Sequence, residues 1–266
     1  YDALGQLKQK GVGGKTTRLQ TVDYSYNVRG WLTQINDVNS SDKLFNFKIG
    51  YNQGTNPLYN GNIAQTQWSS QSLNPNDYPK AHTYNYTYDA LNRIYSAIDN
   101  TGGYSLNYVG YDKNGNIKSL GRSGTTLPRI PEVYEMDRLV YDYKENSNQL
   151  IWVIDKADYG HQGGFINGNQ SREDHVYDAN GNLKKDGNKG ISSIIYNHLN
   201  LPTKVVIANS EHIGNIEYIY DATGVKLKKI VSTGATTEYA GNYVYENGSL
   251  KFFNHAEGYV EPDGSS

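Results

Sequence analysis

The chain of 266 residues carries 25 Lys and Arg against 27 Asp and Glu, so its formal net charge at pH 7 is only −2. A near-neutral chain without a basic stripe argues against nucleic acid as a partner, and the absence of cysteine excludes disulfides and thiol chemistry. The longest apolar runs, residues 150–154 and 205–208, are far shorter than the about 20 residues of a membrane-spanning helix, so no membrane span is expected.

A tyrosine followed by Asp, Asn or Glu and then by a short polar turn recurs along the chain. We call these residues the marker tyrosines. The clear copies begin with Tyr-Asp and close on an aliphatic residue; they start at Tyr1, Tyr88, Tyr111, Tyr177 and Tyr220. The looser copies start at Tyr26, Tyr51, Tyr141, Tyr196 and Tyr245. The mean step of about 27 residues lies in the range of structural repeats, which predicts a stacked scaffold.

Strict alternation of apolar and polar residues predicts half-buried strands around each turn. In chain order, the strands that lead into turns are expected near residues 22–26, 82–88, 139–143 and 216–220. The strands that follow turns are expected near residues 94–98, 117–119, 183–185 and 250–252. Each unit is therefore a hairpin, and tyrosine is expected to be the main core material of the shared sheet face.

The turns carry their own signals. Asp112, Asp178 and Asp221 stand where a carboxylate can bond the backbone two residues on. The pairs Asn114-Gly115, Asn180-Gly181 and Asn247-Gly248 predict tight hairpins because both residue types tolerate positive φ. The predicted structural residues of the repeat are Tyr1, Asp2, Tyr88, Asp89, Tyr111, Asp112, Gly115, Tyr177, Asp178, Gly181, Tyr220, Asp221 and Gly224.

The repeat runs from end to end, so residues 1–266 are expected to form one continuous array. A Gly-rich polar stretch at about 155–174 predicts a long loop, and residues 71–79 and 121–131 predict smaller breaks. A helical period is almost absent. The predicted fold class is all-β, a curved strip of stacked antiparallel β-hairpins.

No pattern predicts chemistry. The run Asp112-x-Asn114-x-Asn116 resembles the start of a calcium loop, but its Gly and its twelfth residue do not fit, so no metal is expected. The six histidines lack metal-ligand spacing. The acidic residues near Glu135 and the run Glu173–His175 are expected in surface loops. With no catalytic motif present, we predict no catalytic residue, no cofactor and no enzyme.

The unit Tyr-Asp-x-x-Gly-x-Leu/Ile resembles the YD repeat of RHS proteins, and the resemblance covers nearly all of the chain. Residues 178–203 and 243–259 resemble Bacteroidetes-type RHS proteins shortly before the end of the repeat core. The resemblance implies a hollow shell of hairpins, which in polymorphic toxins and insecticidal toxin complexes encloses a C-terminal toxin and in teneurins serves adhesion. No core-associated self-cleavage motif is recognisable, and Asp263-Gly264 does not reproduce its signature, which predicts a fragment of a larger shell.

The expected function is therefore that of a shell segment in a secreted or surface bacterial protein. Its implied partners are the rest of its own RHS chain, an enclosed toxin or effector polypeptide, and the secretion machinery. The alternative is surface adhesion or carbohydrate binding through the aromatic repeats. Repeats of that kind rely on exposed tryptophan, whereas Trp31, Trp68 and Trp152 are out of register with this repeat.

Overall fold

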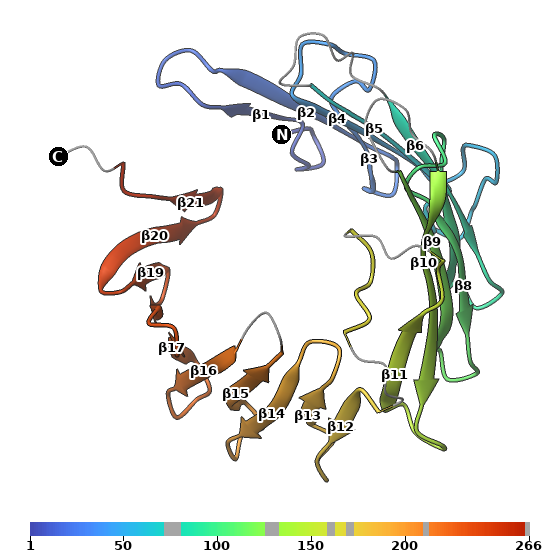
Figure 1. The fold of residues 1–266 in the computed structure, drawn as a ribbon. Coiled ribbons are helices and arrows are strands. Elements are labelled where there is room, and N and C mark those ends of the chain that lie inside the picture. Colours follow the sequence, from blue (N-terminus) through green and yellow to red (C-terminus); the bar gives the residue numbers. More distant parts are fainter. Residues whose placement is uncertain (72–80, 126–132, 159–162, 169–172, 210–212, 264–266) are drawn as a thin grey trace. The chain divides into compact units, whose positions relative to one another are not determined.

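The computed structural model describes residues 1–71, 81–125, 133–158, 163–168, 173–209 and 213–263. Every helix or strand assigned within these ranges is a β-strand, and the strands pair as successive antiparallel hairpins (Figure 1). The predicted all-β class of stacked hairpins is confirmed. No helix in the described ranges has the length and hydropathy needed to cross a membrane.

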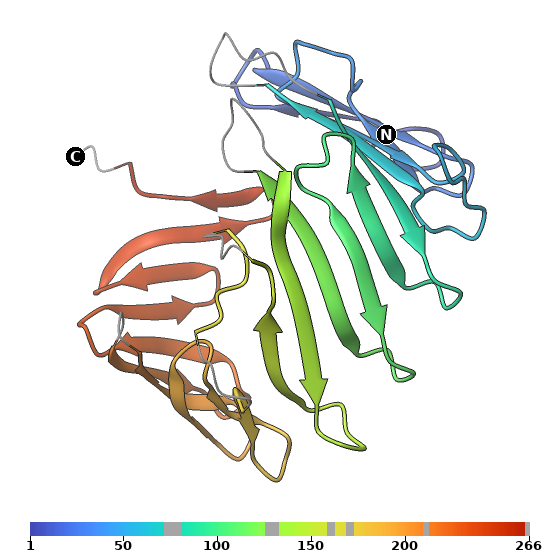
Figure 2. The ribbon, with the colours of Figure 1, turned by 45° about the vertical axis from the view of Figure 1, so that its right-hand side comes forward.

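The strands form two sheets in which each strand pairs with its neighbours in sequence (Figure 2). The eleven-stranded sheet contains β1 (Gln9–Val12), β2 (Gln20–Tyr26), β3 (Leu32–Ile35), β4 (Phe45–Gly50), β5 (Gln65–Ser70), β6 (His82–Tyr88), β7 (Ile94–Asp99), β8 (Leu106–Tyr111), β9 (Ile117–Thr125), β10 (Val133–Tyr143) and β11 (Leu150–Asp155). The ten-stranded sheet contains β12 (His175–Tyr177), β13 (Leu183–Asp186), β14 (Ile191–Tyr196), β15 (Pro202–Ala208), β16 (Ile213–Tyr220), β17 (Lys226–Val231), β18 (Thr236–Ala240), β19 (Tyr243–Glu246), β20 (Ser249–His255) and β21 (Gly258–Val260).

The chain divides into two compact units. One comprises Tyr1–Val140 with Asp155–Phe165, and the other comprises Tyr141–Ile154 with Ile166–Ser266. Each unit is itself a strip of hairpins, because an isolated hairpin is marginal in water and becomes stable only beside its neighbours. The single continuous array stays a prediction.

The buried centre differs from the tyrosine core expected from the sequence. The buried apolar residues are Ala64, Ala97, Val109, Leu139, Val153, Ile194 and Val244, and no tyrosine in the described ranges is among them. The largest side chains that are completely buried are polar: Asn46, Asp137 and Asp174. The prediction that tyrosine is the main core material is therefore wrong. Most marker tyrosines are half-buried and cover the sheet.

The predicted breaks are partly corrected. Strand β9 continues to Thr125, so the expected break at 121–131 is wrong for residues 121–125, and residues 126–131 lie outside the described ranges. Of the break at 71–79, only Gln71 is described. The expected loop at 155–174 begins one residue late, because Asp155 ends β11, and its other described residues form no strand. Residues 159–162 and 169–172 of that loop lie outside the described ranges.

Candidate functional site

The turn after each clear marker tyrosine is held by one side-chain oxygen. In the copy that starts at Tyr111, Asp112 Oδ1 accepts the backbone N–H of Asn114 at 2.8 Å and that of Asn116 at 2.9 Å. The same pair of bonds, 2.8–3.1 Å long, is made by Asp2, Asn27, Asp89, Asp178, Asn197 and Asp221. The looser copies at Tyr26 and Tyr196 therefore fold like the clear ones, because an asparagine carbonyl accepts the same two donors.

The backbone of these turns is also the same. In the Asp178 turn, the Gly181 N–H donates to the Asp178 carbonyl at 3.1 Å, and the Asp178 N–H donates to the Asn182 carbonyl at 2.9 Å. The fourth residue of each turn has a positive φ, which suits Gly and is tolerated by Asn. These residues are Gly5, Gly30, Asn92, Gly115, Gly181, Asn200 and Gly224, with φ between 57° and 90°.

This geometry corrects the predicted turn type. Of the pairs Asn114-Gly115 and Asn180-Gly181, only the glycine has a positive φ, so neither pair forms the expected two-residue turn. The oxygen of the preceding aspartate organises a longer turn instead. The pair Asn247-Gly248 does behave as predicted, since both residues have positive φ (51° and 82°) between the paired residues Glu246 and Ser249.

A β-bulge stands directly before six of the marker tyrosines. The register shifts immediately before Tyr26, Tyr88, Tyr111, Tyr177, Tyr196 and Tyr220. Bulges redirect a side chain relative to the regular pleat. Each of these tyrosines is thereby aimed along the sheet toward the preceding hairpin.

The marker hydroxyls join consecutive repeats. Tyr111 Oη donates to the carbonyl of Ile94, the aliphatic residue that closes the preceding copy, at 2.8 Å. Equivalent bonds of 2.7–3.1 Å run from Tyr26 to Leu7, Tyr51 to Leu32, Tyr88 to Ile63, Tyr196 to Leu183 and Tyr220 to Pro202. We call these contacts the inter-repeat hydrogen bonds. The Tyr177 hydroxyl also interacts with the backbone of Leu150.

Both polar groups of the repeat have shifted pKa values. Burial raises the pKa of the hydroxyls of Tyr88, Tyr111, Tyr177, Tyr196 and Tyr220. In the turns, the pKa of Asp112 is lowered chiefly by the hydrogen bond from the Asn116 side chain. The pKa of Asp178 is lowered chiefly by the Asn182 side chain, and that of Asp221 by the Thr223 hydroxyl. For Asp89, the Arg93 backbone N–H is the main cause.

Neighbouring turns also contact one another. Asn60 and Asn62 donate from Nδ2 to Asn92 Oδ1 at 2.8 and 3.1 Å. In the other unit, Asn182 Nδ2 donates to Asn200 Oδ1 at 2.8 Å. A turn that has Asn in place of Gly at its fourth position thus gains a side chain that bridges to the preceding turn.

Tyr1 departs from the pattern. Its own turn closes normally on Asp2, but its side chain is 85% exposed. Its place among the structural residues of the repeat stays a prediction.

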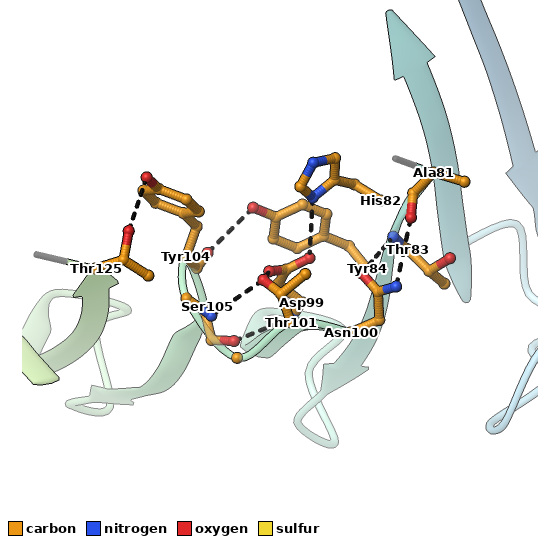
Figure 3. A network of polar contacts seen from close by, with 12 residues as sticks. Ala81, His82, Thr83, Tyr84, Asp99, Asn100, Thr101, Tyr104, Ser105 and Thr125 are labelled. Carbon is orange, nitrogen blue, oxygen red and sulfur yellow. Dashed lines mark hydrogen bonds and ion pairs between the residues drawn. The ribbon is translucent and has the colours of Figure 1, made fainter. Parts of the chain in front are cut away.

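A polar network joins β6, β7 and β8 in the first unit (Figure 3). His82 stacks on Trp68 with ring centroids 4.4 Å apart and places Nδ1 3.6 Å from Asp99 Oδ1. Thr101 donates its hydroxyl to Asp99 Oδ2, and the Asp99 N–H donates to Ser105 Oγ at 3.0 Å. The side chain of Asp99 is inaccessible to solvent. The network fixes the β7–β8 connection around a buried carboxylate.

The acidic residues predicted in surface loops are placed differently. Asp137 lies in β10, is fully buried and receives Arg122 Nε at 2.5 Å and the Phe165 N–H at 2.6 Å. Asp174 is also fully buried, and His175 begins β12. Two residues are consistent with the surface prediction by exposure. The side chain of Glu135, in β10, is 39% accessible, and Glu173, which belongs to no strand, is exposed. The neighbouring Glu132 lies outside the described ranges.

The histidines do not form a metal centre in the described ranges. His82 and His175 each face a buried aspartate across a hairpin, Asp99 at 3.6 Å and Asp186 at 3.9 Å. Within the part of the chain that the structure describes, no three His, Cys, Asp or Glu side chains gather as metal ligands. His161 and His212 lie outside it.

Sequence reasoning identified the turn residues but missed the partners of the tyrosine hydroxyls. A signal for them was present, because the closing aliphatic residue of three clear copies, Leu7, Ile94 or Leu183, supplies the accepting carbonyl. The burial of Asp137 and Asp174 had no local signal, since their partners lie 14 or more residues away.

No protein-family profile and no curated protein matches this chain. Among solved structures, 87% of the chain aligns with 13% of a chain in the crystal structure of TcdB2-TccC3-TEV, at a TM-score of 0.49 and 10% identity. In a second TcdB2-TccC3 structure, 88% of this chain aligns with 15% of the other at a TM-score of 0.32 and 13% identity. A porin-like protein from Bacteroides uniformis aligns over 85% of this chain at a TM-score of 0.17. Likenesses this weak do not establish a shared function.

Proposed function

We propose that this chain is a structural wall segment of an RHS-type shell, and that it encloses or presents another polypeptide. The observation that carries the proposal is the inter-repeat hydrogen bond, which ties a marker tyrosine to the preceding hairpin at six places in the described chain. A bond of this kind connects one copy of the repeat to the copy before it. It therefore supports a wall built by repetition.

The proposal includes export to the cell surface or the medium, a larger parent chain and a toxin or effector as the enclosed polypeptide. It also includes a non-catalytic role for this segment. The support is the repeat motif together with the two sheets of consecutive hairpins. The aspartates of the motif accept the hydrogen bonds that hold the turns, which is a structural role.

The natural protein that contains this chain provides the test. We expect limited proteolysis to leave the repeat array and an enclosed polypeptide intact, and denaturant to expose that polypeptide to cleavage. Mass spectrometry of the fragments identifies each cut. If the enclosed polypeptide is cleaved at the same protease concentration with and without denaturant, the enclosing role is refuted.

A second candidate function is carbohydrate binding, supported by one pocket. The pocket has a volume of about 230 Å³, and its lining includes Trp31, Tyr51, Tyr59 and Asn52. Aromatic rings beside carboxamides are suited to the apolar faces and hydroxyls of a sugar ring. Tyr59 is 75% exposed, so Tyr59→Ala should leave the fold intact and abolish any change in tryptophan fluorescence on sugar titration. Unchanged fluorescence of the parent chain across a panel of sugars would exclude this function.

A further inference from the structure

Three buried oxygens in the second unit lack hydrogen-bond partners. They are Oδ1 of Asn167, Asp174 and Asn188. Buried polar atoms are nearly always satisfied by protein, water or an ion, so each exception requires an explanation. Three exceptions in one short stretch of sequence point to a shared cause.

Two of the three side chains are in direct contact, and the third stands next to a residue that packs against them. Asn188 Nδ2 donates to Asp174 Oδ2 at 2.9 Å, and the Gly187 N–H donates to the Asp174 carbonyl at 2.7 Å. The residue after Asn167 lies against the same loop, because a Cβ added at Gly168 would stand 2.2 Å from the Asn188 carbonyl oxygen. Asn188 is thus in direct contact with Asp174 through its side chain, and its backbone packs against the residue that follows Asn167.

The charge of Asp174 is poorly compensated. The residue is fully buried, and its Oδ2 accepts only the neutral donors Val153 N–H, at 3.3 Å, and Asn188 Nδ2. No ion pair within the described ranges includes Asp174. Asp137 is equally buried but has Arg122 and the Phe165 N–H on its two oxygens. A buried carboxylate without a cation is costly.

We propose that Asp174, Asn188 and Asn167 hold a calcium ion. All three free donors are hard oxygens, one from a carboxylate and two from carboxamides, which is the ligand chemistry of Ca²⁺. Backbone carbonyls and water complete the coordination of such sites. A single carboxylate places the affinity in the weak range of extracellular calcium modules, with a Kd on the order of 10⁻⁴ to 10⁻³ M.

The site is distinct from the calcium-like run in the repeat. Asp112 uses Oδ1 for the Asn114 and Asn116 N–H groups and Oδ2 for the Asn116 side chain, so both of its oxygens serve the turn. The carboxylate of Asp174, in contrast, keeps one oxygen unused. The alternative occupant of the site is ordered water, which the test separates from the ion.

The test is thermal unfolding of the full chain in EGTA and across a calcium titration. At a hundredfold excess over Kd, the unfolding temperature should rise by roughly 5–10 °C. Terbium provides a second readout, because Trp152 adjoins Val153, whose N–H contacts Asp174, and should sensitise bound Tb³⁺. Absence of both a calcium-dependent rise and terbium luminescence would overturn the proposal in favour of water.

Two variants and one control sharpen the test. Asp174→Asn should abolish the calcium response, whereas Asp158→Asn, whose side chain is 84% exposed, should leave it unchanged. Asn167→Asp adds a second carboxylate and should tighten Kd by about tenfold or more, since affinity rises with ligand charge. If Asn167→Asp is instead destabilised equally with and without calcium, or if Asp174→Asn retains the response, no ion is shared by these oxygens.

Discussion

Removal of a single marker hydroxyl gives a direct measure of how strongly consecutive repeats are joined. Tyr111→Phe deletes the 2.8 Å bond to the Ile94 carbonyl and keeps the ring, over which the Arg93 guanidinium lies at 4.4 Å. An intramolecular hydrogen bond contributes about 0.5–1.5 kcal/mol net. Since the Ile94 carbonyl also loses a donor, we expect a loss of about 1–1.5 kcal/mol in the free energy of unfolding.

Urea denaturation measures this loss, and hydrogen exchange locates it. Repeat arrays can open in parts, so faster exchange should be confined to the amides of β7 and β8. The matched control is Tyr95→Phe, whose side chain is 50% exposed and whose effect should stay within about 0.5 kcal/mol. Tyr26→Phe combined with Tyr111→Phe should be additive, because the two bonds share no partner. Equal losses for Tyr111→Phe and Tyr95→Phe would show that the hydroxyl contributes nothing.

Three further predictions concern the turns and the buried ion pair. Gly181→Val places a β-branched residue at φ 84° and should lower the free energy of unfolding by about 2 kcal/mol or more. Gly181→Asn should lower it far less, because Asn200 occupies the equivalent position of another turn. Equal urea midpoints for the two variants would contradict this reasoning. The lowered pKa of turn aspartates such as Asp112 predicts a contribution to stability that is complete above the unfolded pKa of about 3.9 and is lost as the pH falls through the lower folded pKa. Asp112→Asn should therefore flatten the pH dependence of the free energy of unfolding between about pH 2 and 5. An unchanged pH profile would refute the stabilising role of the Asp112 carboxylate. Arg122→Met should leave Asp137 buried without its cation and lower the free energy of unfolding by about 3 kcal/mol, and a loss below about 1 kcal/mol would show that the pair is not needed.

The sequence predicts the hairpins well because their determinants are local. Period-two alternation located strands such as β6 and β16, and the short carboxylates of Asp112, Asp178 and Asp221 bond the backbone two residues on as expected. The looser copies at Tyr26 and Tyr196 were recognised, although their use of an asparagine oxygen was not.

Long-range contacts account for what the sequence did not predict. Asp137 and Asp174 resemble loop residues by composition, but strand pairing and the packing of residues 163–168 enclose them. The turn at Asn114-Gly115 differs from the predicted type because Asp112 Oδ1 accepts the Asn116 N–H as well as the Asn114 N–H, which produces a longer turn. The role of Tyr111 as a donor depends on a carbonyl 17 residues earlier, and no periodicity reports such a partner.

The span between donor and acceptor in the inter-repeat hydrogen bonds varies from 13 to 25 residues. The alignment of adjacent hairpins is thus fixed by one tyrosine hydroxyl and one backbone carbonyl, and it does not depend on the number of residues between them. Extra sequence should be tolerated where it leaves such pairs untouched, as at exposed Gly54–Asn56, which lies between the donor Tyr51 of one bond and the acceptor Ile63 of the next. This stretch is accordingly a suitable place to graft an epitope tag or a fluorophore acceptor peptide without disturbing the flanking ribbons.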